Sequence, residues 1–256
     1  MGNDSMILEM NNITKNFFQN GNKLEVHSDM SFGVVEGEFL CIIGPSGCGK
    51  STLLKEIAGF EKIDSGVITL NGNEISGPEI NRIMVFQDYD QLFPWKTVLQ
   101  NVVFPLKVNK IGDSKREREN VARKYLDMVK LNDFCDYFPH QLSGGMKQRV
   151  ALIRALVIKP KILLMDEPFG SVDAETRDEL QQMLLDLWRS INVTIIFVTH
   201  DIHEAILLSN RILVMGTGPD NIKRIIKNNI PFPRKDKHQE IFDMHEKLNE
   251  LMKVNY

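Results

Sequence analysis

Residues 44–52 have the sequence Gly44-Pro45-Ser46-Gly47-Cys48-Gly49-Lys50-Ser51-Thr52. This is the pattern of a phosphate-binding loop: a glycine, four residues, Gly-Lys, and then serine or threonine. An apolar run at 39–43 predicts a buried strand before the loop, and apolar residues at helical spacing in 51–58 predict a helix after it. Strand, glycine-rich loop and helix is the order that the motif requires. The sequence therefore predicts a binding site for a nucleoside triphosphate.

The residue types of this loop explain how it would hold phosphate. Its three glycines let the backbone turn tightly and bring N–H groups against phosphate oxygens. The following helix points its positive end at the same anion. Lys50 supplies a positive charge for the β and γ phosphates, and the hydroxyl of Ser51 is placed to hold Mg²⁺.

Cysteine usage adds an expectation about reactivity. Cys41, Cys48 and Cys135 have no metal-binding spacing and are odd in number, so we expect a cytoplasmic protein with reduced thiols. Cys48 lies near a predicted helix N-terminus and close to Lys50, and both features favour a thiolate. We therefore expect a lowered pKa for Cys48 and its reaction with maleimide.

Composition excludes some classes of function. The chain has 256 residues, 43% of them hydrophobic and 25% charged, with a net charge of −3, as in an ordinary globular protein. Basic runs are interleaved with acids, which argues against a nucleic-acid surface. No apolar run reaches the roughly 18–20 residues of a membrane span, and residues 1–10 lack a signal-peptide core. We expect any membrane role to come through a partner.

The rest of the chain divides into strand-rich and helix-rich segments. Short apolar runs separated by turn residues in 6–14, 23–43 and 66–72 predict a small antiparallel sheet. From residue 88 to 160 the apolar spacing is helical, which predicts helices Val98–Val108, Ser114–Leu131 and Ser143–Val157. The tail after residue 236 has apolar residues along one helix face.

Several polar residues lie where predicted strands end. Asp166, after the apolar run 162–165, is placed to bind Mg²⁺ through water, and Glu167 to orient or deprotonate a water molecule. Acids also follow strands simply because the chain emerges into solvent. His200 follows the β-branched run 193–199; it is either structural or shares a sheet edge with Asp166 and Gly44.

Two other motifs have more than one interpretation. Phe17 and Phe18 lie in a predicted loop, where they either pack in the core or offer a ring that stacks on a base. Ser143, Gly144 and Gly145 begin a predicted helix, with Ser143 as N-cap and backbone N–H groups at the positive helix end. Taken alone, this is a common way to start a helix.

In this order, the motifs resemble those of the ATP-binding cassette family of transport ATPases, over residues 10 to 233. The matches are Phe17 with the adenine-stacking aromatic, 44–52 with Walker A, Gln87 with the Q-loop, 142–146 with the signature, 162–166 with Walker B, Glu167 with the catalytic glutamate, Ser171-Val172-Asp173 with the D-loop and His200 with the switch histidine. Phe17 stands where tyrosine is commoner, and Met146 replaces the usual glutamine.

The resemblance implies a single α/β domain over 1–256, a P-loop NTPase with a RecA-like mixed sheet flanked by helices. The nucleotide-binding core with its small antiparallel β subdomain would comprise 1–87 and 161–233. An inserted α-helical subdomain with the signature would comprise 88–160, and a C-terminal helix 234–256.

The resemblance also implies how the site works. Two copies would form a head-to-tail dimer that encloses ATP and Mg²⁺, each loop being completed by Ser143, Gly144 and Gly145 of the other copy. Glu167 would polarise the attacking water, while His200 and Gln87 sense the γ-phosphate. Asp173 would belong to the contact between copies, and the metal ligands would be Ser51, Gln87 and Asp166.

A closer likeness is to the ATPases of nitrate, sulfonate and taurine importers, carried by Gln87-Asp88, 92–98, Asn101-Val102, 146–149 and 166–170. It implies separate permease subunits at the inner face of the cell membrane and, indirectly, an extracytoplasmic solute-binding protein. The segment Phe93–Trp95 would contact the permease; alternatively, Trp95 is tucked under its loop. A soluble ATPase switch and an exporter ATPase are the other interpretations. Nitrate, sulfonates, taurine and heterocyclic vitamin precursors all fit as solutes.

Overall fold

The structure is a computed structural model, and it describes residues 5–19, 21–86, 91–170, 172–217 and 222–253. The chain forms two compact units. The first unit comprises Met1–Glu79 and Thr194–Tyr256, and the second comprises Ile80–Val193. Both units contain strands and helices.

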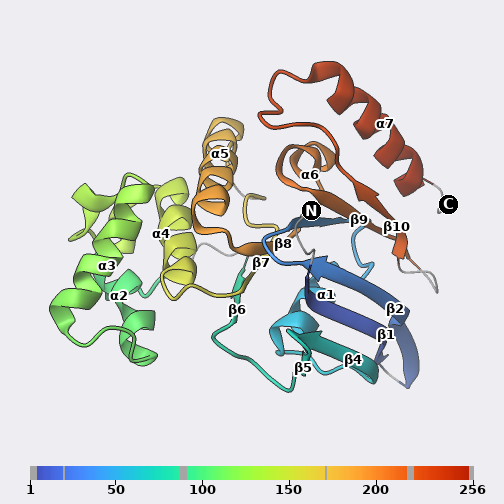
Figure 1. Ribbon diagram of the computed structural model, residues 1–256, viewed down its shortest axis with the longest axis horizontal. Coiled ribbons are helices and arrows are strands. Elements are labelled where there is room, and N and C mark those ends of the chain that lie inside the picture. The colour runs from blue at the N-terminus through green and yellow to red at the C-terminus, as the bar shows by residue number, and fades with distance from the viewer. Residues whose placement is uncertain (1–4, 20, 87–90, 171, 218–221, 254–256) are drawn as a thin grey trace. The chain divides into compact units, whose positions relative to one another are not determined.

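The first unit contains a four-stranded antiparallel sheet with the order β2-β1-β4-β5. β1 (Met6–Gln19) and β2 (Asn22–Val35) form a long hairpin, with β4 (Ser65–Leu70) and β5 (Asn73–Glu74) beyond β1 (Figure 1). β4 and β5 are joined by Asn71-Gly72, both with positive φ (49° and 75°), as a tight hairpin turn requires. The predicted small antiparallel sheet is therefore present, but residues 39–43, which were predicted with it, belong to a different sheet.

A second sheet of this unit carries the phosphate-loop sequence. β3 (Phe39–Ile43) is parallel to its neighbours β8 (Thr194–Val198) and β9 (Arg211–Met215), and β10 (Ile222–Lys227) is antiparallel to β9. Every residue of β3 and β8 is buried. Strands covered on both faces have continuous apolar sequences, which explains the unbroken run at 39–43.

Helices α1 (Lys50–Ala58), α6 (Ile202–Leu208) and α7 (His238–Lys253) belong to the same unit. α6 packs on β3, and α7 lies beside α6 (Figure 1). The buried guanidinium of Arg234 holds the C-terminal end of α6, because it donates to the carbonyl oxygens of Ile206 (2.7 Å) and Ser209 (2.8 Å).

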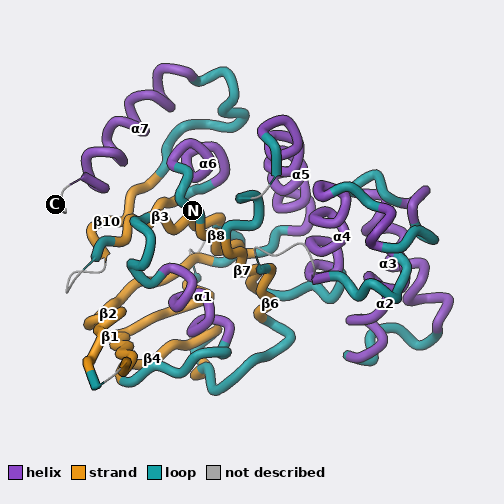
Figure 2. The backbone as a smooth tube through the Cα atoms, turned by 180° about the vertical axis from the view of Figure 1, so that it is seen from behind, coloured by secondary structure: helices purple, strands orange, loops and turns teal. Residues whose placement is uncertain are grey.

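The second unit contains parallel strands β6 (Arg82–Val85) and β7 (Ile162–Asp166) with mostly helical chain between them. Its helices are α2 (Val98–Val108), α3 (Lys115–Met128), α4 (Gly144–Leu156) and α5 (Ala174–Ile191). α2, α3 and α4 lie side by side (Figure 2). The helices predicted between 98 and 157 are confirmed, with ends that differ by at most three residues. Within the described ranges, no helix has the length and apolar character of a membrane span.

Candidate functional site

The phosphate-loop sequence forms a strand–loop–helix turn in the first unit. β3 ends at Ile43, as predicted, and α1 begins at Lys50, one residue before its predicted start. Gly47 (φ 80°) and Gly49 (φ 101°) are in the left-handed region that glycine adopts without strain. Gly49 is the N-cap of α1 and has no side chain to make a capping bond, so the positive end of the helix faces the loop. The backbone therefore has the form of an anion-binding loop.

Lys50 lies across this loop. Its side chain is buried, and its ammonium donates to the carbonyl oxygens of Gly44 (2.8 Å) and Pro45 (2.9 Å). These bonds hold the positive charge at the N-terminus of α1 and keep it out of solvent. The residues present thus fit a phosphate group, which would find backbone N–H donors and an ammonium in one place.

The surroundings of Cys48 contradict the lowered pKa that was predicted for its thiol. The residue is only 3% exposed, and burial raises the pKa of its thiol despite the opposing effect of Lys50. Its sulfur packs inside the loop: a Cβ added at Gly44 would lie 2.9 Å from Cys48 Sγ and 2.7 Å from the carbonyl oxygen of Met215. The predicted lowering of the pKa was wrong because desolvation outweighs the neighbouring cation.

Phe17 and Phe18 also differ from prediction in their local structure. They lie on β1, not in a loop, with Phe17 opposite Leu24 of β2. The Phe17 ring is 37% exposed, so it does not serve as core packing. Lys15 Nζ lies 4.8 Å from the ring centroid, a cation–π distance. The second interpretation, an exposed ring for stacking on a base, stays a prediction.

His200 follows β8 in the first unit and is exposed. Thr199 donates its backbone N–H to the carbonyl oxygen of Ile42 (3.2 Å). Ile42 is the second-to-last residue of β3. Because β3 and β8 are parallel, their carboxyl ends meet at one edge of the sheet. His200 and Gly44 therefore share that edge, as predicted.

The predicted acids lie in the second unit, where β7 ends. Asp166 is the last residue of β7, and Glu167 follows it in the left-handed region (φ 45°). Both are half-buried. A positive φ is uncommon for a residue other than glycine, and such conformations concentrate at functional sites. The Glu167 carbonyl accepts from the N–H of Gly170 (3.1 Å), which holds the turn after the strand.

The signature residues begin α4. Ser143 is its N-cap, as predicted, and its hydroxyl accepts from the N–H of Met146 (3.3 Å). Ser143 and Gly144 are exposed, whereas Gly145 is buried against α5, where an added Cβ would lie 2.6 Å from Thr176 Cγ2. The first turn of α4 therefore needs a glycine at 145 for packing, while Ser143 and Gly144 lie at the surface.

The D-loop residue Asp173 is the N-cap of α5. Its carboxylate accepts from the backbone N–H of Thr176 (2.9 Å), and this bond holds the pKa of Asp173 below its usual value. Ser171 of the same motif and Gln87, the predicted γ-phosphate sensor and metal ligand, lie outside the described residues.

The loop before α2 presents the predicted partner-binding aromatics. Buried Asn101 fixes this loop: its side-chain oxygen accepts from the N–H of Phe93 (2.9 Å), and its amide donates to the carbonyl oxygens of Lys96 (3.1 Å) and Thr97 (3.0 Å). Trp95 is 70% exposed, so the alternative of a ring tucked under the loop was wrong.

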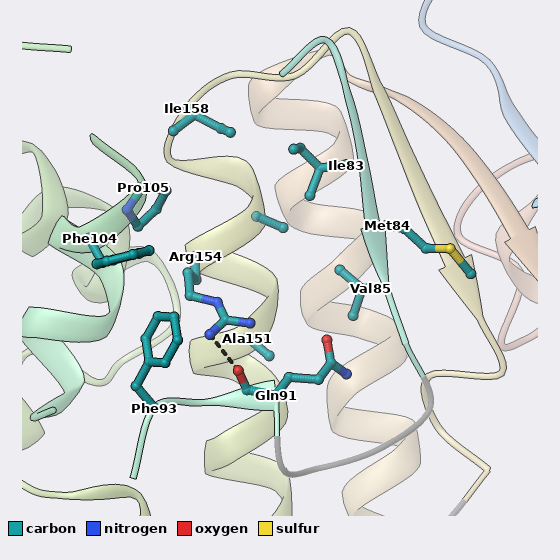
Figure 3. A pocket seen from close by; sticks show the side chains of 11 residues that line it. Ile83, Met84, Val85, Gln91, Phe93, Phe104, Pro105, Ala151, Arg154 and Ile158 are labelled. Atoms are coloured by element: carbon teal, nitrogen blue, oxygen red, sulfur yellow. Dashed lines mark hydrogen bonds between the residues drawn. The ribbon is translucent and has the colours of Figure 1, made fainter. Parts of the chain in front are cut away.

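A cavity of about 260 Å³ lies beside this loop, between β6, α2 and α4. Its lining is mostly apolar. Figure 3 shows the side chain of Arg154 reaching from α4 toward Phe93 and Gln91, and its guanidinium donates to the carbonyl oxygen of Gln91. Burial lowers the pKa of Arg154, whose guanidinium carbon lies 5.5 Å from the Phe93 ring centroid. Arg154 was not predicted from the sequence, because one arginine in an amphipathic helix has no distinguishing pattern.

Another pair that the sequence analysis missed is His27 on β2 and Glu56 on α1. Both side chains are fully buried, with 3.0 Å between His27 Nδ1 and a Glu56 carboxylate oxygen. A signal was present: Glu56 lies three residues after Leu53 and directly before Ile57, on the apolar face of α1. A charged residue on that face needs a buried partner.

The site residues are thus divided between the units. Phe17, the loop 44–52 and His200 belong to the first, and Ser143–Gly145, Asp166, Glu167 and Asp173 to the second. Among the described residues, no group of three or more His, Cys, Asp or Glu side chains could hold a metal ion by itself.

Comparison with known proteins identifies relatives of the whole chain. Residues 27–170 match the family model described as ABC transporter. A nitrate import ATP-binding protein of Synechocystis sp. is 43% identical, covering 88% of this chain and 84% of that one. An aliphatic sulfonates import ATP-binding protein of Bacillus cereus is 40% identical, covering 95% and 94%.

A solved structure shares the fold. The dimeric post-hydrolysis state of an ATP-binding cassette bound to ADP and Pi has a TM-score of 0.75 and 32% identity, covering 87% of this chain and 99% of that one. This likeness confirms the predicted mixed α/β P-loop NTPase fold.

Proposed function

The chain belongs to the ABC transporter family, and on that premise we propose that it is the ATP-hydrolysing subunit of an importer for a small solute. The observation that carries the proposal is the loop 44–52, with the buried ammonium of Lys50 across it and the start of α1 behind it. The relatives named as nitrate and sulfonate import proteins favour an importer over an exporter or a soluble switch.

The phosphates of ATP would lie in the loop. The N–H groups of 47–51 and the start of α1 would bind their oxygens, and Lys50 would exchange its bonds to Gly44 and Pro45 for the β and γ phosphates. The exposed Phe17 ring would stack on adenine. A phenylalanine keeps the stacking face that the commoner tyrosine provides.

Ser51 and Gln87 would bind Mg²⁺ directly, and Asp166 through water. The ion would neutralise charge on the β and γ phosphates.

Hydrolysis would use Glu167 as the residue that handles water. Its carboxylate would orient a water molecule and accept its proton while the water oxygen bonds to the γ-phosphorus. The bond from that phosphorus to the β–γ bridging oxygen breaks, and ADP leaves with the electron pair. His200 and Gln87 would contact the γ-phosphate and stabilise the charge on its oxygens.

Two copies would close head to tail over two ATP molecules. The relative that is dimeric with ADP and Pi bound supports the formation of a dimer. Ser143 and Gly144, exposed at the start of α4, would cover the γ-phosphate of the other copy, and Asp173 would lie in the contact between copies.

Permease subunits would bind at the loop before α2. Trp95 is an exposed aromatic anchor on a loop that Asn101 holds rigid, and the adjacent cavity could receive an apolar side chain of the partner. This contact would keep the protein at the inner face of the membrane, with a solute-binding protein acting on the other side.

Uptake by cells tests the proposal. Deleting the gene should abolish uptake of isotopically labelled nitrate or of an aliphatic sulfonate such as taurine. The parent gene should restore uptake, and Lys50→Ala should not. Normal uptake of every candidate solute in the deletion strain would contradict an importer role.

A further inference from the structure

The buried pair His27 and Glu56 lies directly behind the phosphate loop. Nδ1 of the imidazole is 3.0 Å from a Glu56 oxygen, and Nε2 is 3.2 Å from the carbonyl oxygen of Gly49. The ring therefore connects α1 with the residue that precedes Lys50. None of the roles described above uses this pair.

Both ring nitrogens of His27 face oxygen acceptors. Only the imidazolium can donate a hydrogen bond from both nitrogens, because the neutral ring has one N–H. The carboxylate of Glu56 is the partner that a buried imidazolium requires. A neutral ring beside a protonated Glu56 would make the same two bonds with the same number of protons. In either form, the arrangement needs one shared proton.

The orientation of the Gly49 carbonyl determines the orientation of a backbone N–H in the phosphate loop. It belongs to the same trans peptide as the N–H of Lys50, so the two groups point in opposite directions and fixing one fixes the other. The carbonyl also accepts from the N–H of Leu53 (2.8 Å), in the first turn of α1. The ring lies against the glycine: an added Cβ at Gly49 would be 2.6 Å from His27 Nε2.

We propose that His27 is a positioning residue of the phosphate loop, which together with Glu56 fixes the Gly49 peptide and makes nucleotide affinity depend on the shared proton. The inference rests on the proposed binding of ATP at 44–52. When that proton is lost, one ring nitrogen faces oxygen without hydrogen. The neutral Gly49 carbonyl is a weaker acceptor than the carboxylate, so its contact is the one given up. Affinity for MgATP therefore falls as pH rises.

Other charged groups near the pair have their own partners. Lys15 is the register partner of His27 on β1, and its ammonium binds Glu61 (2.6 Å) and the carbonyl oxygen of Lys62 (2.6 Å). Lys50, on α1, binds the carbonyl oxygens of its own loop. Within the described part of the chain, the carboxylate in contact with the ring is that of Glu56.

The test measures the dissociation constant of MgATP for the full chain at several pH values. From the lowest to the highest of these pH values, the constant of the parent should rise about 3- to 10-fold more than that of His27→Leu/Glu56→Leu, the effect of one hydrogen bond. The double variant replaces both polar partners by apolar groups, which a buried site tolerates better than the loss of one. Titration of ATP itself is common to both proteins and cancels.

Glu56→Gln separates positioning from stability. Its amide can donate to Nδ1, so a neutral ring keeps its Nε2 hydrogen for Gly49. At the highest pH measured, this variant should bind MgATP more tightly than the parent, and its pH profile should be flatter. Parent and Glu56→Gln profiles that run parallel would overturn the inference, whether or not the double variant folds.

Lys50→Ala separates a failure of the proposed phosphate site from a failure of the proposed role of His27 and Glu56. Normal MgATP binding by Lys50→Ala would show that the phosphate site itself is wrongly placed. Loss of binding in Lys50→Ala, together with parallel pH profiles in the other proteins, would overturn only the role of His27 and Glu56.

Discussion

Glu167 combines a carboxylate at a strand end with a left-handed backbone (φ 45°). Replacing it by glutamine keeps the size of the side chain and removes its basicity. We expect MgATP binding to persist and turnover to fall about 10²-fold or more, the usual contribution of a positioned base. Phosphate release measured on the purified chain checks this. Hydrolysis near the parent rate would exclude Glu167 as the residue that activates water.

Cys48 provides a second test at the scale of one residue. Because burial raises the pKa of its thiol, little thiolate exists at neutral pH and maleimide should react slowly. The rate should increase about tenfold per pH unit until the raised pKa is reached. Mass spectrometry of labelled peptides reads the rate, and Cys48→Ala is the control. A rate at about pH 7 above that of an unstructured cysteine peptide would contradict the burial.

Sequence predicted the residues of the phosphate loop but not the burial of each side chain. The glycines and Lys50 follow from the motif, because its backbone conformation needs them at fixed spacing. Cys48 was wrongly predicted because its neighbours along the chain, a cation and a helix end, are visible in the sequence, whereas the packing against Gly44 is not. His27 and Glu56 are 29 residues apart, so no local pattern pairs them.

At the scale of elements, the loop before α2 is held by the buried Asn101 and exposes Trp95. Trp95→Ala should reduce transport in membranes while the purified chain keeps its basal ATPase activity, because the ring is 70% exposed and Asn101 holds the loop without it. Phe242→Ala, on the exposed face of α7, is a matched control that removes another exposed ring (59%). Should basal ATPase activity be lost with transport, Trp95 would have a structural role instead.

Asn101 is buried, so its replacement, unlike that of Trp95, should destabilise the fold. Asn101→Ala leaves the backbone groups of Phe93, Lys96 and Thr97 without their partner, so it should destabilise the protein by about 1–3 kcal/mol. Urea unfolding followed by circular dichroism measures this change. A midpoint equal to that of the parent would mean that the loop is held by other contacts.

Elements with one strong periodicity were predicted well. α2 and α4 have the expected bounds to within one residue, since a cap and a regular apolar face define each. Phe17 and Phe18 were assigned to a loop because the register shifts along β1 interrupt the alternation expected for a strand. Sequence alternation therefore does not identify the end of this strand, which is recognised from the pairing of Phe17 and Phe18 with β2.

At the scale of the whole molecule, the proposed site needs two copies, and complementary variants can test this. Lys50→Ala impairs the phosphate loop and leaves the signature intact. Gly144→Asp has the opposite effect: it keeps the Ser143 cap and places a carboxylate at the exposed start of α4, where it would repel the γ-phosphate. Each variant alone should be nearly inactive.

In a head-to-tail dimer of the two variants, one site combines the intact loop of Gly144→Asp with the intact signature of Lys50→Ala. An equimolar mixture should therefore recover ATPase activity, up to about a quarter of the parent rate, since half of the dimers are mixed and each has one complete site. Circular dichroism of each variant verifies folding, and a mixture of Lys50→Ala with Lys50→Ala/Gly144→Asp is the control that restores no site. If the signature instead acted within its own chain, no mixture would regain activity, because neither chain would hold a complete site.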